Sequence, residues 1–140
     1  MGLFDWLLRP KQSRSRRARI MGSGQYDQDI VGEANYQDAL NRTCGGKTED
    51  GHEHECSAQL FEEPTNKYDS NAVKVTINGR TVGYLSRADA VDYKRALASA
   101  GLAGRAVDVD AIVVGGWDRG NRGSGHYGVK LDMEMPPEFD

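Results

Sequence analysis

The stretch that decides the fold is Glu62–Arg87, which reads E-E-P-T-N-K-Y-D-S-N-A-V-K-V-T-I-N-G-R-T-V-G-Y-L-S-R. It holds a polar turn over residues 63–70 and then two alternating runs separated by the pair Asn78-Gly79. An Asn-Gly pair in this setting is the strongest short-range signal for a β-hairpin, because a type I′ turn needs positive φ at both central residues. The stretch therefore predicts a hairpin over residues 71–85.

A two-residue loop also fixes the expected register of the hairpin. The predicted pairs are Ile77–Arg80, Val75–Val82, Lys74–Gly83 and Val73–Tyr84. One face of the hairpin is then apolar and should point into the core, with the Tyr84 ring at its end, at the mouth of a barrel. This face consists of Val73, Val75, Ile77, Val82 and Tyr84.

The rest of the chain supplies two helices and four further strands. Ser86 and Asp89 predict the start of a helix that stops at Gly101, and its buried face would be Ala90, Tyr93, Leu97 and Ala100. An earlier helix is predicted from an Asn35 cap to the residue before Gly45. The strands are expected over residues 29–33, 53–62, 107–113 and 127–133. This order predicts a mainly β fold with two helices, in which about six short strands form a small, partly closed barrel.

Charge divides the chain into a basic leader and an acidic domain. Residues 1–24 carry six Lys or Arg and one acidic residue, whereas residues 25–140 carry twelve basic and twenty acidic residues, so the net charges are +5 and −8. We expect a disordered or amphipathic leader over 1–24, a barrel domain over 25–135 and a tail over 136–140. The leader could contact an anionic membrane surface, a partner groove or nucleic acid. The acidic domain argues against broad wrapping of duplex DNA, so a nucleic-acid site should be small and local.

Composition indicates a cytoplasmic protein. No apolar run approaches the roughly 20 residues of a membrane span, and the basic cluster follows the apolar residues 3–8, the reverse of a secretory signal. Two cysteines are too few for a disulfide framework. We expect reduced thiols and no cofactor.

The sequence does not predict a metal site at His52, His54, Cys44 and Cys56. On a strand, residues four apart stand about 13 Å apart, whereas the ligand atoms of one zinc ion lie within about 4 Å of one another. His52 and Cys56 therefore cannot share an ion unless the segment is a loop. A partly buried thiol and exposed histidines are the expected arrangement.

Catalytic signals are weak, and the chain is predicted not to be an enzyme. Asp108 and Asp110 share one strand face, but no histidine or lysine is placed beside them by sequence. The glycine-rich segment 115–125 lacks the Gly-Lys-Ser/Thr ending of a P-loop and runs into a strand. It predicts a mobile hairpin loop in which Arg119 and Arg122 could approach phosphates.

The turn over residues 63–71 carries the clearest functional signal. Asn, Asp and Ser are ordinary turn residues, but ordinary turn chemistry does not explain Lys67 and Tyr68 at the tip. An aromatic ring beside a cation suits a stacked base and a bound phosphate.

These residues also carry a family resemblance. Glu63-Pro64-x-Asn66-x-Tyr68-Asp69-x-Asn71-Ala72-Val73, followed by Val82-Gly83-Tyr84-Leu85, resembles the HIRAN domain family. Val31-Gly32-Glu33 and Gly115-Gly116-Trp117 are similar to its small bacterial stand-alone members. The resemblance extends over about residues 28–133 and implies a modified OB-like β-barrel.

The resemblance further implies capture of the 3′-hydroxyl end of single-stranded DNA, as in the eukaryotic fork-remodelling translocases that carry this domain. It makes Asp69 the acceptor for the terminal hydroxyl, Tyr68 the stacking ring and Arg87 the phosphate ligand. The complete set of implied nucleic-acid-binding residues is Tyr36, Asn66, Lys67, Tyr68, Asp69, Tyr84, Arg87 and Tyr127. The expected role is DNA repair or replication restart beside a larger DNA-processing partner.

Two positions depart from the DNA-binding members of the family. Ala34 and Asn35 stand where those members place an arginine and an aromatic residue. Together with the acidic balance, this departure keeps open a second interpretation, in which the chain is a protein-interaction or structural adaptor that retains the barrel without DNA binding.

Overall fold

The predicted hairpin is present in the computed structural model, which describes residues 17–140. Its strands are β4 (Val73–Ile77) and β5 (Arg80–Tyr84), and Asn78 and Gly79 between them have φ of 52° and 76°. The predicted pair Ile77–Arg80 is confirmed, but the pairing shifts at a β-bulge beyond Thr76. Val75 pairs with Gly83 and Lys74 with Tyr84, so the predicted partners of residues 73–75 are wrong by one residue.

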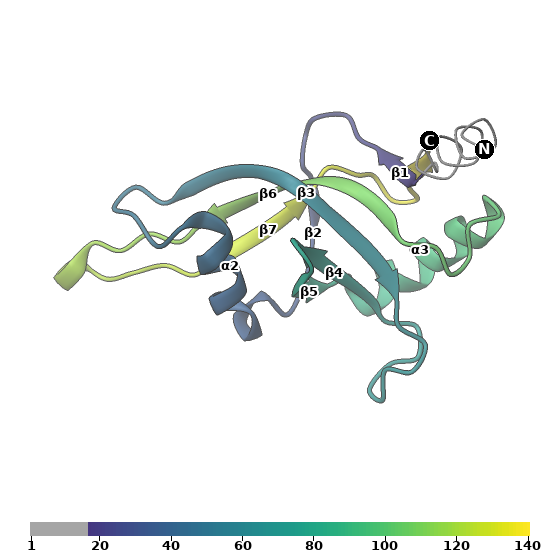
Figure 1. The fold of residues 1–140 in the computed structure, drawn as a ribbon, viewed down its shortest axis with the longest axis horizontal. Coiled ribbons are helices and arrows are strands. Elements are labelled where there is room, and N and C mark those ends of the chain that lie inside the picture. Colours follow the sequence, from purple (N-terminus) through teal and green to yellow (C-terminus); the bar gives the residue numbers. More distant parts are fainter. Residues whose placement is uncertain (1–16) are drawn as a thin grey trace, which may run out of the picture.

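The hairpin lies at one edge of a strongly curled sheet (Figure 1). The strand order is β2-β7-β6-β3-β4-β5, in which β2 is Gln28–Asp29, β7 is Tyr127–Leu131, β6 is Val107–Gly115 and β3 is His52–Glu62. Neighbours along this path are antiparallel. The predicted fold class, mainly β with two helices in an OB-like barrel of about six strands, is confirmed.

The two edges of the sheet meet at Val31. This residue follows β2 and exchanges two backbone hydrogen bonds with Tyr84 of β5, at 2.8 and 2.9 Å. The strand predicted over residues 29–33 ends early, because Gly32 has a φ of 83° and Glu33 begins a 3₁₀ helix, η1 (Glu33–Asn35). The predicted first strand therefore runs four residues beyond the end of β2 at Asp29, although Val31 still forms an isolated bridge with Tyr84. The turn that replaces its end faces the barrel mouth.

The two α-helices begin and end close to their predicted limits. Helix α2 (Gln37–Cys44) ends at Gly45, but its N-cap is Tyr36 without a side-chain bond, so the predicted Asn35 cap is wrong. Helix α3 (Arg87–Ser99) has the predicted cap, since the Ser86 hydroxyl accepts a 3.1 Å bond from the Asp89 N–H. Its predicted face is buried over Ala90, Tyr93 and Leu97, whereas Ala100 is exposed at the C-cap.

Two short strands lie in segments where the sequence predicts none. Strand β1 (Ala18–Met21) runs parallel to β6 and antiparallel to β8 (Glu138–Phe139). Ala18 and Ile20 are buried, so this part of the expected leader packs against the domain. The amphipathic pattern over residues 3–8 lies outside the described residues.

The core fills the curled sheet and is covered by α3 at one end and α2 on another side (Figure 1). Four of the five hairpin side chains predicted to form the buried face are fully buried. The prediction is wrong for Tyr84, because the bulge places it opposite Lys74, on the other face of the hairpin, where it is half-buried. Within residues 17–140, none of the helices is long and apolar enough to cross a membrane.

Candidate functional site

A pocket of about 420 Å³ opens where the 63–72 turn, η1 and the end of β5 meet. It contains six of the eight predicted binding residues, which come from three separate segments: Tyr36, Asn66, Tyr68, Asp69, Tyr84 and Arg87. Val31, Asn35, Ala72 and Leu85 complete the lining. Residues that the sequence identified one by one are thus brought to one concave surface.

The turn is held in shape by Asn66. Its side-chain oxygen accepts bonds from the backbone N–H groups of Tyr68 (2.9 Å) and Asp69 (3.1 Å). Asp69 continues the pattern, because its carboxylate accepts from the Asn71 N–H at 2.9 Å. These are the Asx-type bonds expected of turn residues, and they fix where the Tyr68 ring and the Asp69 carboxylate point.

Glu63 joins this turn to the barrel. Its Oε1 accepts from the Asn66 amide at 2.8 Å and from the Tyr84 hydroxyl at 3.0 Å, and Lys74 Nζ lies 3.6 Å from its Oε2. The bond from Asn66, with the bond from Tyr84 and the charge of Lys74, holds the pKa of Glu63 below its ordinary value despite partial burial. Glu63 is therefore a carboxylate at neutral pH that locks the turn against β5.

The Tyr84 phenol is held in its protonated form. Burial, and then the Glu63 carboxylate, raises the pKa of Tyr84 well above its ordinary value. Its ring lies 6.5 Å from the Tyr36 ring, centroid to centroid, at 46°. The two aromatic rings thus form one wall of the pocket, and the hydroxyl of Tyr84 is a fixed donor.

Gly83 allows the two edges of the sheet to pair beside the rings of Tyr36 and Tyr84. A Cβ on Gly83 would lie 2.7 Å from both the Val31 carbonyl oxygen and Ile30 Cδ1, closer than real Cβ atoms approach. Residue 83 must therefore lack a side chain for the backbone at Val31 to pair with Tyr84. The Val-Gly-Tyr-Leu run is readable in sequence, but this close approach is a property of the tertiary structure.

The rim of the pocket is exposed and partly cationic. The Tyr68 side chain is 78% exposed, and Lys67 Nζ lies 5.8 Å from its ring centroid. Lys67 itself borders a neighbouring hollow of about 360 Å³, which shares Asn66 and Tyr68 with the pocket. Arg87 donates a 3.1 Å bond to the Tyr68 carbonyl and so braces the turn from the first residue of α3.

Tyr127 is placed elsewhere. It is 3% exposed, its hydroxyl donates to Asn41 Oδ1 at 2.8 Å, and its ring lies 5.5 Å from the His52 ring. Its backbone N–H also donates to Gln37 Oε1. These contacts make Tyr127 part of the packing between α2 and β7, and we leave it out of the proposed site.

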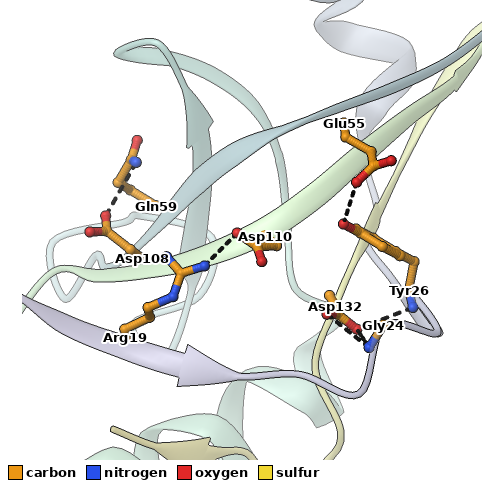
Figure 2. Close-up of polar contacts among 8 residues, drawn as sticks. All are labelled: Arg19, Gly24, Tyr26, Glu55, Gln59, Asp108, Asp110 and Asp132. Atoms are coloured by element: carbon orange, nitrogen blue, oxygen red, sulfur yellow. Dashed lines mark hydrogen bonds and ion pairs between the residues drawn. The ribbon is translucent and has the colours of Figure 1, made fainter.

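The acid pair on β6 is occupied by neighbouring side chains. Asp110 pairs with Arg19, and Asp108 accepts from Gln59 (Figure 2) and from Arg17 at 2.9 Å. Figure 2 also shows Asp132 accepting from the N–H groups of Gly24 and Tyr26. These carboxylates fasten the segment that contains β1 across the sheet.

The histidines and cysteines do not gather around one point. Across residues 17–140, no group of three or more His, Cys, Asp or Glu is arranged to hold a metal ion. His52 Nδ1 lies 2.9 Å from the Gly115 carbonyl oxygen, and His54 is exposed. Burial raises the pKa of the Cys56 thiol to about 11 and raises that of Cys44 as well.

The glycine-rich segment after β6 folds back on the 45–51 loop. Trp117 bridges to Thr48, Arg119 Nε donates to the Glu49 carbonyl at 3.1 Å, and the Arg119 guanidinium lies 4.5 Å from the Trp117 ring. Arg119 is therefore engaged in holding this loop, and neither it nor Arg122 lines the 420 Å³ pocket.

Sequence reasoning did not single out Glu63, Val31 or Leu85 as site residues. Glu63 begins the recognised turn, but its partner Tyr84 lies 21 residues away. Val31 lines the pocket because it pairs with Tyr84, which is 53 residues away in the sequence, and no local pattern reveals this contact.

Comparison with known families gives a match over more than half of the chain. The family model described as HIRAN domain matches residues 33–113, which span η1, the turn, the hairpin, α3 and most of β6. No curated protein and no solved structure matches the chain.

Proposed function

Since the chain belongs to the HIRAN domain family, whose members are nucleic-acid-binding modules, we propose that its pocket captures the 3′-hydroxyl end of single-stranded DNA. The observation that carries the proposal is the convergence of Tyr36, Asn66, Tyr68, Asp69, Tyr84 and Arg87 on one pocket. Its volume of about 420 Å³ lies within the usual range of small-ligand sites. A strand end is the part of DNA that such a pocket could enclose.

Asp69 is the proposed reader of the terminal hydroxyl. A carboxylate offers about four acceptor positions, and the Asn71 N–H uses one of them. The carboxylate can therefore accept from a free 3′-hydroxyl, whereas it would repel a 3′-phosphate. This discrimination rests on charge and needs no contact with base edges.

The aromatic residues supply sequence-independent affinity. Every base has a π-face, and stacking on an aromatic side chain contributes on the order of 1–3 kcal/mol per base. The exposed Tyr68 ring is the proposed platform for the last nucleotide, with Lys67 beside it. Arg87 has five N–H donors, so it can brace the Tyr68 carbonyl and still donate to a phosphate.

The charge of the domain agrees with end capture. Residues 25–140 carry a net charge of −8, which disfavours a long phosphate track. We propose a non-catalytic module that serves DNA repair or replication restart beside a larger DNA-processing protein. The acidic pair on β6 supports the non-catalytic role, because Asp108 pairs with Arg17, just before β1, and Asp110 pairs with Arg19 of β1.

Fluorescence anisotropy with oligonucleotides that end in a 3′-hydroxyl or a 3′-phosphate tests the proposal. We expect at least about tenfold tighter binding of the hydroxyl form, since a hydrogen bond to a charged group contributes roughly 1.5–3 kcal/mol. Asp69→Asn keeps the side-chain acceptor for Asn71 but removes the charge, and should abolish the preference. Equal affinity of the wild type for both ends, or none for either, would refute end capture.

Tyr68→Ala is the matching test of stacking. We expect a loss of about 5–150-fold in affinity for both kinds of oligonucleotide. Because Tyr68 is 78% exposed, its removal should leave the thermal melt nearly unchanged. A large drop in melting temperature would instead show that Tyr68 is a structural residue.

The adaptor remains the second candidate function. Asn35 lines the pocket and Ala34 is exposed beside it, so the pocket lacks the arginine and the aromatic ring expected at these positions. A folded protein that binds no oligonucleotide, together with a protein partner whose capture survives Asp69→Ala but fails on deletion of residues 1–16, would support the adaptor. This deletion keeps β1, whose Ala18 and Ile20 are buried in the domain.

A further inference from the structure

A second hollow, of about 400 Å³, lies on the outer face of β3 and β4. It is lined by Arg17, Gln59, Phe61, Lys74, Thr76 and Gly79. The hollow shares no residue with the candidate pocket. The strand pairing nevertheless places residues of the hollow and of the pocket in one row across the sheet.

The connection is a row of side chains across three strands. The bulge in the hairpin places Lys74 opposite Tyr84, and β3 places Phe61 opposite the same lysine. Directly opposed residues point to the same face of a sheet. Neighbouring strands are about 4.8 Å apart, so the row from Tyr84 to Phe61 spans roughly 10 Å.

Phe61 is exposed on a face that is otherwise polar. Its side chain is 37% exposed, and Lys74 Nζ lies 5.7 Å from its ring centroid. Five large hydrophobic residues are exposed within residues 17–140, and two of the others, Val31 and Tyr68, line the candidate pocket. Exposed apolar side chains thus occur in both the pocket and the hollow, and Lys74 lies between Tyr84 and Phe61 in the row that joins them.

We propose that the hollow binds a nucleotide upstream of the captured 3′ end, with its base stacked on Phe61. This inference rests on the proposed function of the pocket. At about 3.4 Å per stacked nucleotide, 10 Å corresponds to three steps at most, and to fewer in a stretched strand. The base on Phe61 therefore lies within the last four nucleotides.

Stacking, more than charge, holds this nucleotide. Lys74 lies 3.6 Å from the Glu63 carboxylate, and Arg17 is paired with Asp108 at 2.9 Å. Asp108 also accepts from Gln59 in the floor of the hollow (Figure 2). Each cation is balanced by a carboxylate, so the gain in affinity from the hollow should depend only weakly on salt.

The experiment measures affinity against oligonucleotide length. Thymidine oligonucleotides of two, three, four, six and eight residues, all with a 5′ dye and a 3′-hydroxyl, are titrated by anisotropy. For the wild type we expect affinity to rise by roughly 5–150-fold from two to four residues and then to level off. Phe61→Thr, which keeps a β-branched residue in the strand, should lose this rise and keep the affinity for the dinucleotide.

Val91→Thr is the matched control. Val91 is 39% exposed on α3, outside both the pocket and the hollow, and its substitution should leave the length dependence unchanged. Phe61→Trp tests the site even if Phe61→Thr fails to fold. Its added fluorescence, measured against the wild-type background, should be quenched by six-residue oligonucleotides and not by dinucleotides.

Two results would overturn the inference while leaving end capture intact. One is dinucleotide binding as tight as binding of eight residues, and the other is the same length dependence in the wild type and Phe61→Thr. If a folded wild type binds none of the oligonucleotides, the proposed function itself fails, and the inference fails with it.

Discussion

Substitution of Gly83 by alanine tests how the barrel is closed. The added Cβ would lie 2.7 Å from the Val31 oxygen and from Ile30 Cδ1, and both contacts involve the segment that joins the sheet edges. Either residues 30–31 move away, or the end of β5 does. Each movement breaks the pair of backbone hydrogen bonds between Val31 and Tyr84.

The expected cost follows from these contacts. Overpacking costs about 1–3 kcal/mol, and two lost backbone hydrogen bonds cost about 1 kcal/mol each. Replacing glycine in the unfolded chain returns roughly 0.4–1 kcal/mol. We therefore expect the free energy of unfolding to fall by about 2–4.5 kcal/mol, which lowers the Tm of a domain of this size by roughly 7–15 °C.

Circular dichroism melts of Gly83→Ala and of a matched control measure this effect. Gly128→Ala is the control, because it lies in β7 and its Cβ would meet Glu33 and Val114 at an ordinary 3.7 Å. We expect Gly128→Ala to melt within a few degrees of the wild type, since a glycine-to-alanine change at an unstrained position is worth under about 1 kcal/mol. The reasoning is refuted if the two variants melt together.

Three further predictions concern single groups. Glu63→Gln should lower the free energy of unfolding most at neutral pH. The pKa of Glu63 is lower in the folded than in the unfolded protein, so its carboxylate stabilises the fold above the ordinary carboxyl pKa of about 4.3. This stabilisation is lost as the pH falls through the lower pKa of the folded state. Urea titrations of both proteins at pH 7 and pH 3 check this, and a difference that does not shrink at pH 3 would contradict it. Ser86→Ala should cost about 1 kcal/mol through loss of the α3 cap, measured by the same titrations, and Ser86→Asp should restore most of it. Cys56 should react with iodoacetamide at pH 7.4 about 100-fold more slowly than a thiol of ordinary pKa. A rise in pKa from 9.0 to about 11 lowers the thiolate fraction by that factor. Peptide mass spectrometry can measure the rate in native and in denatured protein, and equal rates would contradict the prediction.

Local chemistry explains why much of the fold was predictable. Asn78-Gly79 sets a type I′ turn and Ser86-x-x-Asp89 caps a helix, whatever the rest of the chain does. The alternation over residues 53–62 likewise predicts β3 with Ala58 and Leu60 buried, as observed. The turn from Glu63 to Asn71 shapes itself through Asn66 and Asp69, which is why its tip residues could be recognised without a structure.

Contacts between distant segments decided the rest. Three contacts of Tyr84 join residues that carry no local signal of one another. The bulge places Tyr84 in the row with Lys74 and Phe61. The Tyr84 hydroxyl donates to Glu63, and the Tyr84 backbone pairs with Val31. Strands β1 and β8 are four and two residues long, and they exist only because β1 pairs with β6 and β8 pairs with β1. The tertiary structure also decided the place of Tyr127. The family resemblance implied a binding role for this residue, but its packing against His52 and Asn41 buries it. Neighbouring residues determine short-range hydrogen bonding, so the sequence alone predicts it. The closure of the barrel and the pocket at its mouth depend instead on how the curled sheet brings its two edges together.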